Sequence, residues 1–383
     1  MSYSSRIIQR WDWSIKPTKH YRVLVQALPP FHSTPHTVAI AQWFEKLPPA
    51  NSPRFPESLK SLYLRPISTG WSLNLIAPRK ARFLQISLYH WTQLTPPPAN
   101  QYEAQIDEIP LLSPKKVTLA VAYQNHPLKT TWAKNVALTC KTIENAGQKK
   151  VDLLCLSENF LSRGVQGSLE TLACEVDSPR LTPVLKAIQK AKLYAVFGFK
   201  EKEQDHYYTT AVLVSPQGKI IGKYRKRYLT FSELSDGACP GDDFPVFETE
   251  IGKIGMLICW DSWFPETARA LARKEVDIIC MPIAGNGNPH HWEHAWRARA
   301  IDNQLFWMAS VTGNCGGVAP SRIIAPDGAL LAQTKKANDI AFATVILRHP
   351  QETYWLSIAD CYAETRNILN YSHRPEEILS PLS

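Results

Sequence analysis

The sequence lacks the features that mark several large classes of proteins. It has no uninterrupted apolar stretch long enough to span a bilayer, so neither a membrane protein nor a membrane partner is expected. It has no Gly-rich loop after a predicted strand, so nucleotide binding is not indicated. The first 13 residues contain two arginines and an aspartate but no apolar core, which argues against a secretory signal.

Cysteine never occurs as a Cys-x-x-Cys pair, although the chain has 8 cysteines. In a chain without a secretory signal, scattered cysteines indicate reduced thiols rather than a disulfide framework. We therefore expect a cytoplasmic protein, in which one of these thiols is a candidate nucleophile.

Neighbouring histidines give only a weak indication of a metal site. His290 and His294 are spaced i, i+4 in a predicted helix, but their order is not H-E-x-x-H and no third ligand is evident. A helix start near the mouth of a pocket explains them better, so we expect neither a metal nor another cofactor. A serine nucleophile is also disfavoured, because Ser232 and Ser262 lie in no nucleophile motif.

Charge and proline are unevenly distributed along the chain. Residues 1–116 hold 14 Lys and Arg against 6 Asp and Glu, which is +8 of the net charge of +9. They also hold 15 of the 29 prolines. Such a shift predicts two domains, a basic, Pro-rich module of unknown role over 1–115 and a second domain over 116–383. No basic-aromatic nucleic-acid motif is present, so a solvated surface is favoured over a nucleic-acid partner.

The first module is expected to be an α+β extension. Its predicted strands are Tyr21–Ala27, Trp71–Ile76 and Ala81–Tyr89, and Val38–Glu45 is predicted to be a helix. Pro-rich joints separate these segments, and Thr95–Pro114 is predicted to be a linker.

From Val117 onward, strands alternate with helices, which is typical of an α/β fold. The predicted helices are 130–146, 181–191, 265–273 and 292–304, and the predicted strands are 117–123, 151–156, 194–199, 210–214, 219–223, 254–259, 276–281, 306–311, 321–325, 329–333 and 340–347. Several strands follow one another through short turns, so the sheet should be mixed rather than wholly parallel. A core of two sheets with helices outside fits this order.

Cys259 is the first residue with a pattern that suggests chemistry. It ends the apolar strand Ile254–Ile258 and precedes a turn into a helix that starts at Pro265. At such a strand end a thiol becomes accessible, and backbone N–H groups after the turn can bind an oxyanion. The alternative is an ordinary buried thiol, which is the usual fate of a free cysteine.

Glu158 and Lys226 are candidates for similar reasons. Glu158 follows the buried strand Val151–Leu156 directly, where partial burial raises a carboxyl pKa and suits it to general-base work. Lys226 lies in a basic run, but the period of a strand places Tyr224, Lys226 and Tyr228 on one face. An inward ammonium needs an anionic partner, which Glu158 or the Cys259 thiolate would supply. The alternatives are an exposed loop carboxylate and a solvated basic face.

Three segments together resemble the signature of the carbon–nitrogen hydrolase (nitrilase) superfamily. They are Leu156-Ser157-Glu158, Tyr224-Arg225-Lys226-Arg227-Tyr228-Leu229 and Cys259-Trp260-Asp261-Ser262-Trp263-Phe264-Pro265-Glu266, in the order of that family. The resemblance covers about Val117 to Leu347, and the last segment is most similar to the branch that acts on N-carbamoyl amines.

The resemblance implies a four-layer α-β-β-α sandwich, a homodimer or larger homo-oligomer, and a Glu-Lys-Cys triad made of Glu158, Lys226 and Cys259. It also implies a second glutamate, for which Glu233 is the candidate. The chain departs from the family pattern at Ser157, where Pro is usual, and at Tyr228, where His is usual. These departures concern loop geometry and substrate preference.

The expected function is therefore hydrolysis of a non-peptide carbon–nitrogen bond in a small amide or N-carbamoyl amine, through a cysteine thioester and with release of ammonia. Trp260, Tyr228 and Asn286 are predicted to contact the substrate, and the Trp260 N–H to bind the oxyanion. The alternatives are a nitrilase or an N-acyltransferase on the same fold, or a non-catalytic scaffold whose basic N-terminal module binds a partner.

Overall fold

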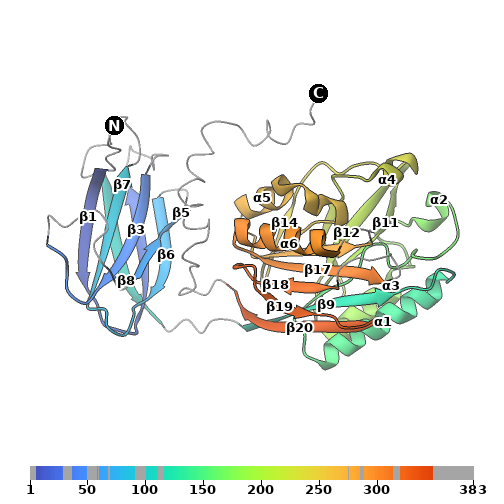
Figure 1. The fold of residues 1–383 in the computed structure, drawn as a ribbon, viewed down its shortest axis with the longest axis horizontal. Coiled ribbons are helices and arrows are strands. Elements are labelled where there is room, and N and C mark those ends of the chain that lie inside the picture. Colours follow the sequence, from blue (N-terminus) through green and yellow to red (C-terminus); the bar gives the residue numbers. More distant parts are fainter. Residues whose placement is uncertain are drawn as a thin grey trace. The chain divides into compact units, whose positions relative to one another are not determined.

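The computed structural model describes residues 6–28, 37–49, 58, 60–67, 70–90, 101–110, 116–274, 276–284, 289–313 and 320–347 (Figure 1). The chain divides after Pro114 into two compact units, and Lys115–Leu347 forms the second. Within the described ranges, every helix is too short or too polar to cross a membrane. Residues 348–383 lie outside these ranges, so one domain over 116–383 stays a prediction.

The described part of the first unit consists of two four-stranded antiparallel sheets. One has the order β1-β7-β3-β4 and the other β5-β6-β2-β8. The strands are β1 (Arg6–Ser14), β2 (His20–Ala27), β3 (Thr37–Phe44), β4 (Lys60–Tyr63), β5 (Arg65–Ile67), β6 (Gly70–Ile76), β7 (Phe83–His90) and β8 (Tyr102–Ile109).

The two sheets of the first unit share one apolar core. Val23 and Val25 of β2 pack in the same cluster as Ala41 and Trp43 of β3, which belongs to the other sheet. The rings of Tyr21 and Trp43 also meet, with 6.3 Å between their centroids. Alternate residues of β2 and β3 therefore face this core, as in a β-sandwich.

Two predictions for the first unit are wrong. Val38–Glu45 was expected to be a helix, but Thr37–Phe44 is strand β3, paired with both β4 and β7. Ala39, Ala41 and Trp43, which alternate along this strand, belong to the core that the two sheets share, and the helix-forming Ala and Gln residues in this segment concealed this period of two. The linker expected over Thr95–Pro114 contains strand β8, which pairs with β2. The described part of this unit is therefore all-β and not α+β.

The second unit contains twelve strands, six α-helices and one 3-10 helix among its described residues. Its strands are β9 (Lys116–Asn125), β10 (Leu153–Cys155), β11 (Tyr194–Glu203), β12 (His206–Val214), β13 (Ile220–Arg225), β14 (Val246–Thr249), β15 (Gly252–Met256), β16 (Ile278–Ile283), β17 (Phe306–Gly313), β18 (Arg322–Ile324), β19 (Leu330–Gln333) and β20 (Asp339–Ile346). Its helices are α1 (Trp132–Gln148), α2 (Leu169–Leu172), α3 (Thr182–Ala191), α4 (Phe231–Ser235), the 3-10 helix η1 (Cys259–Trp263), α5 (Pro265–Arg273) and α6 (Pro289–Asn303).

The strands form two half-sheets that are joined at one point. In the first half, β9, β10 and β11 are parallel, and β12, β13 and β20 are antiparallel additions. In the second half, β15, β16 and β17 are parallel, with β14, β18 and β19 added antiparallel. The halves join where Thr312 and Gly313 pair with Gln124 and Asn125. Strands β10 and β11 contact β16 across the core, so the halves face each other.

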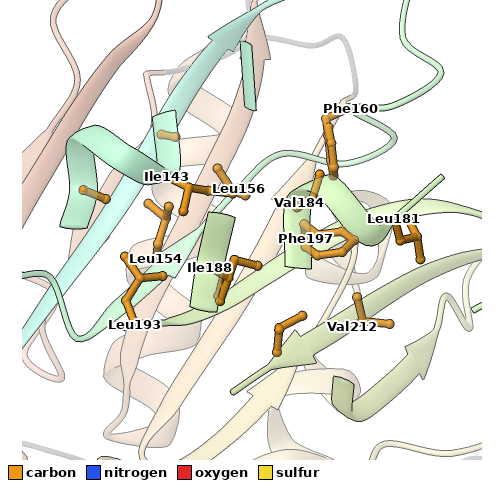
Figure 2. Packing of buried hydrophobic residues seen from close by; sticks show 14 of the residues in the cluster. Ile143, Leu154, Leu156, Phe160, Leu181, Val184, Ile188, Leu193, Phe197 and Val212 are labelled. Atoms are coloured by element: carbon orange, nitrogen blue, oxygen red, sulfur yellow. The ribbon is translucent and has the colours of Figure 1, made fainter. Parts of the chain in front are cut away.

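Helices cover both outer faces of this double sheet. Ile143 of α1 and Val184 and Ile188 of α3 pack on Leu154 and Phe197 of the first half (Figure 2). Helices α5 and α6 contact each other, and α6 contacts β17 of the second half. Figure 1 shows α1 on one side of the strands and α5 and α6 on the other. The predicted four-layer α-β-β-α sandwich is confirmed.

Candidate active site

The three side chains of the predicted triad come from three strand ends. Glu158 lies just past the carboxyl end of β10, and Cys259 lies just past that of β15. Lys226 directly follows β13. Strands β10 and β15 belong to different half-sheets, so the stacking of the halves brings together residues that are far apart in the chain. Glu158, Lys226 and Cys259 are all buried.

Lys226 connects the acidic residues of the site. Its Nζ donates to Glu158 Oε1 at 3.2 Å and to both carboxylate oxygens of Glu233 at 2.9 Å. Burial alone would lower the pKa of Lys226, but the negative charges of Glu158, of Cys259 as thiolate and of Glu233 outweigh burial and raise it. The ammonium therefore stays protonated in the interior.

The alternation predicted along this strand explains why Lys226 points inward. Tyr224 and Lys226 are buried on one face. Lys223 and Arg225 lie on the other face and bind Glu201 at 2.8 and 2.9 Å. The basic run is therefore divided between an interior ammonium and an outer ion-pair network.

Glu158 is held from two sides. Its Oε1 accepts from Lys226, and its Oε2 accepts from the backbone N–H of Ala284 at 2.8 Å. Burial raises the pKa of Glu158, and the charge of Lys226 opposes this rise without cancelling it. Gly198 lies against the same backbone, since a Cβ there would stand 3.1 Å from the Glu158 Cα. Such a carboxylate is poised to take and return a proton.

Cys259 is the first residue of η1 and adopts a left-handed backbone conformation, with φ of 45°. This conformation is uncommon for a residue with a side chain and occurs often at functional sites. Burial, followed by the charge of Glu158, raises the pKa of the Cys259 thiol, while Lys226 and a hydrogen bond from Ala284 N–H oppose the rise. The thiol therefore keeps its proton in the resting site.

Glu233 is fixed by its own helix. It closes a capping box on α4, in which the Thr230 N–H and hydroxyl donate to Oε2 at 2.8 and 2.9 Å. Thr209 donates to Oε1 at 2.9 Å. Burial alone would raise the pKa of Glu233, but Lys226 and Thr230 lower it overall. This carboxylate is therefore ionised and pairs with the Lys226 ammonium.

The family model for carbon–nitrogen hydrolases matches residues 118–353, which is more than half of the chain. This chain belongs to the carbon–nitrogen hydrolase family. The resemblance expected from the three sequence motifs is confirmed, and the chain is a hydrolase.

Curated relatives of this hydrolase include several amidases. An (R)-stereoselective amidase of a Pseudomonas species is 39% identical over 158 residues, which cover 40% of this chain and 57% of the relative. An omega-amidase of Xenopus tropicalis is 28% identical over 237 residues, which cover 57% of this chain and 86% of the relative.

Solved structures of the family have the same fold. An amidase from Nesterenkonia sp. superimposes with a TM-score of 0.54 at 19% identity, covering 62% of this chain and 93% of that one. A Saccharomyces cerevisiae member of branch 10 of the nitrilase superfamily gives 0.55 at 24% identity, covering 60% and 90%.

Asp261 is a residue of the hydrolase site that the sequence reasoning did not single out. It is fully buried, and it accepts from the Tyr224 hydroxyl at 2.7 Å, from Tyr228 N–H at 3.0 Å and from Ile258 N–H at 2.9 Å. These donors flank Lys226 on both sides and precede Cys259. Burial raises the pKa of Asp261 to about 6, against the opposing effect of Lys226. An acidic residue two positions after the candidate nucleophile, between two tryptophans, was the signal that could have identified it.

The two departures from the family pattern have local explanations. The Ser157 N–H and hydroxyl both donate to the Gln124 side-chain oxygen, at 3.3 and 3.0 Å, so hydrogen bonds hold the backbone before Glu158 in place of a rigid proline. The Tyr228 ring stacks on Phe264, with centroids 4.0 Å apart. This contact joins the loop that carries Lys226 to the segment that follows Cys259.

Three side chains were predicted to contact substrate. Trp260 is partly exposed beside Cys259 and meets Trp263 edge to face. Tyr228 is half-buried against Phe264. Asn286 lies outside the described residues. No group of three or more His, Cys, Asp or Glu residues in the described ranges has the arrangement of a metal site.

Asp261→Asn tests whether this carboxylate joins the two loops. The new NH₂ group faces a buried N–H, so one donor loses its acceptor, and the free energy of unfolding should fall by about 1–3 kcal/mol. Alkylation of Cys259 by iodoacetamide should also slow, because the hydrogen bonds through which Asp261 joins the loops of Lys226 and Cys259 are weakened. Urea unfolding and peptide mass spectrometry measure the two effects.

Tyr224→Phe removes a single donor from Asp261 and should have a smaller effect of the same sign. The exposed Asp242→Asn is the matched control and should change neither quantity. An Asp261→Asn protein with the stability and alkylation rate of the parent would contradict the assignment.

Proposed function

We propose that this protein hydrolyses the carbon–nitrogen bond of a small amide through a thioester on Cys259, with release of ammonia. The observation that carries the proposal is the buried ammonium of Lys226, bonded to Glu158 at 3.2 Å and interacting electrostatically with the Cys259 thiol. Glu158 is the proposed base, Lys226 the cation and Glu233 the residue that holds Lys226. N-carbamoyl amines are the second substrate class.

In the first step the thiol proton passes to Glu158 as the sulfur bonds to the carbonyl carbon. The raised pKa values of the Cys259 thiol and Glu158 favour this concerted transfer over a preformed thiolate. The electron pair of the C=O π bond moves to oxygen. In the resting site, burial and Glu158 raise the pKa of the Cys259 thiol by more than Lys226 lowers it.

Two groups are the proposed stabilisers of the oxyanion. Lys226 contributes its positive charge. Trp260 is the second residue of η1, and the first N–H groups of a helix have no acceptor within it, so the Trp260 N–H is the proposed second donor. In an interior of low dielectric, both interactions are stronger than in water.

In the second step Glu158 returns its proton to the nitrogen, the carbon–nitrogen bond breaks, and ammonia leaves a thioester. Water then attacks the thioester carbon and gives a proton to Glu158. The carbon–sulfur bond breaks, the sulfur regains the proton, and the acid is released. The sum is amide plus water giving acid plus ammonia.

The relatives support an amide as substrate, because the curated relatives cited above are named amidases. In one structure of a mutant of the Nesterenkonia amidase, acrylamide has added to the active-site cysteine. A reactive cysteine in an amidase of the same fold supports the proposal that a thiol is the nucleophile here. A cytoplasmic location and a homo-oligomeric assembly stay predictions.

Cys259→Ala should abolish hydrolysis. Without the nucleophile no thioester forms, and the rate of ammonia release should fall by roughly a thousandfold or more. A panel of amides, carbamoyl amines and nitriles, assayed for ammonia, is the measurement. Cys140→Ala, which removes a partly exposed thiol of α1, is the control and should keep full activity. Hydrolysis that survives Cys259→Ala would rule out the proposed mechanism.

On the acidic side, the dependence of kcat/KM on pH should follow the ionisation of Glu158. Only the ionised carboxylate accepts the thiol proton, so kcat/KM falls as the pH falls through the pKa of Glu158. Burial raises that pKa above the ordinary value of 4.5, and the midpoint of the limb should lie above 4.5. Initial rates on a neutral amide at constant ionic strength measure it. A midpoint at or below the ordinary value would contradict the proposed role.

A further inference from the structure

Several loops of the first unit meet at one end of its β-sandwich. The segment after β1 is joined to the segment before β7, because Ile15 N–H donates to the Arg82 carbonyl. Arg82 N–H donates to the carbonyl of Phe44, the last residue of β3. The segment after β6 is joined to the start of β2, because Ala77 N–H donates to the Lys19 carbonyl. We call this surface the basic end, and its cations are Lys16, Lys19, Lys46, Arg79, Lys80 and Arg82.

The basic end carries a large excess of positive charge. All six cations are exposed, and two acidic residues, Glu45 and Glu108, lie among them, which leaves an excess of four positive charges. Lys16 and Lys19 both pair with Glu108, at 3.5 and 3.3 Å. The other four cations form no ion pair with any residue that the structure describes. The next acidic residue, Asp12, lies inside β1 and accepts from Gln85.

This charge is concentrated in one place. Residues 1–116 contain 14 Lys and Arg, and six of them lie at the basic end. The apolar core of the sandwich does not need these side chains, which point to solvent. Like charges held this close repel one another in the free protein, and an anionic partner relieves the repulsion. The basic end is therefore suited to an anionic surface.

Apolar residues lie beside the cations. Leu47 and Pro48, both half-buried, directly follow Lys46, and Pro78 directly precedes Arg79. Apolar groups next to cations can enter the interface of a bilayer while the cations contact anionic head groups. Binding of single-stranded nucleic acid instead relies on exposed aromatic rings that stack on bases. The described residues of the first unit include no large aromatic side chain that is exposed. A lipid surface fits this composition better than a nucleic acid.

We propose that the basic end docks this protein on a membrane surface that is rich in anionic phospholipids. The contact is peripheral: the cations bind the head groups, and Leu47 enters the interface. It needs no apolar span, and the absence of such a span is the reason why no membrane partner was expected. The proposal concerns the first unit and does not depend on amide hydrolysis by the second.

Cosedimentation of the full chain with vesicles tests the proposal. Vesicles of phosphatidylcholine are compared with vesicles in which about one third of the lipid is phosphatidylserine. The protein should bind the anionic vesicles at least about tenfold more tightly than the neutral ones at low salt. Raising the salt to about 0.5 M should remove most of this difference, because it screens exposed charges. Equal binding to both kinds of vesicle at low salt would overturn the proposal.

The double variant Arg79→Ala, Lys80→Ala removes two neighbouring cations of the basic end. Its affinity for anionic vesicles should fall by roughly thirtyfold, the loss expected for two cations near an anionic surface. Lys335→Ala with Lys336→Ala is the matched control, since it removes two neighbouring exposed lysines of the second unit and changes the net charge equally. The control should bind as the parent does, and both variants should keep the parent's amide hydrolysis. An equal loss of binding in the two double variants would overturn the proposal.

Leu47→Ala separates a lipid surface from a nucleic acid. It should weaken binding to anionic vesicles by several-fold at every salt concentration, because salt does not screen an apolar contact. Leu331→Ala, an exposed leucine of β19, is the control and should have no effect. A fluorescent DNA duplex, measured by anisotropy at the same salt, is the competing partner. If the protein binds the duplex more tightly than the anionic vesicles, and Leu47→Ala binds both as the parent does, the proposal is wrong.

Discussion

The buried ammonium of Lys226 is the interaction on which the rest of the site depends. An isolated charge in a protein interior costs several kcal/mol, so Lys226 is stable there only because Glu158 and Glu233 surround it. The same contact keeps the two carboxylates close together despite their repulsion. The charges of all three groups act on Cys259. Burial and Glu158 raise the pKa of its thiol, and Lys226 offsets part of this rise.

The fold of the second unit makes this contact by stacking two half-sheets. Their junction, where β17 pairs with β9, lies next to the site: Gln124 of β9 holds Ser157 before Glu158, and Thr312 of β17 donates to the Ile283 carbonyl at 3.1 Å, just before Ala284. Asp261 then joins the loop of Lys226 to that of Cys259. The site is thus tied to the core of the sandwich through short hydrogen-bonded paths, which favours a fixed geometry.

The sequence predicted the second unit far better than the first, for physical reasons. Elements with clear local signals were found. In the helix over Pro265–Arg273, for example, Pro at the first position and an acidic residue in the first turn mark the start. The strand Thr37–Phe44 was missed because its Ala and Gln residues have helix propensity, which pairing with two neighbouring strands overrides. Asp261 was not identified because its role depends on three donors that only the tertiary fold brings together.

The central claim is that the Lys226 ammonium balances the buried carboxylate of Glu158 and the partly buried carboxylate of Glu233, and Lys226→Met tests it most directly. Urea unfolding of this variant and of the parent should be compared across pH. At neutral pH the variant leaves Glu158 and Glu233 without their cation, and the free energy of unfolding should drop by about 3–5 kcal/mol. The difference should shrink as the pH falls, because protonation removes the unbalanced charges. A variant as stable as the parent at neutral pH, or a loss that does not change with pH, would contradict the account.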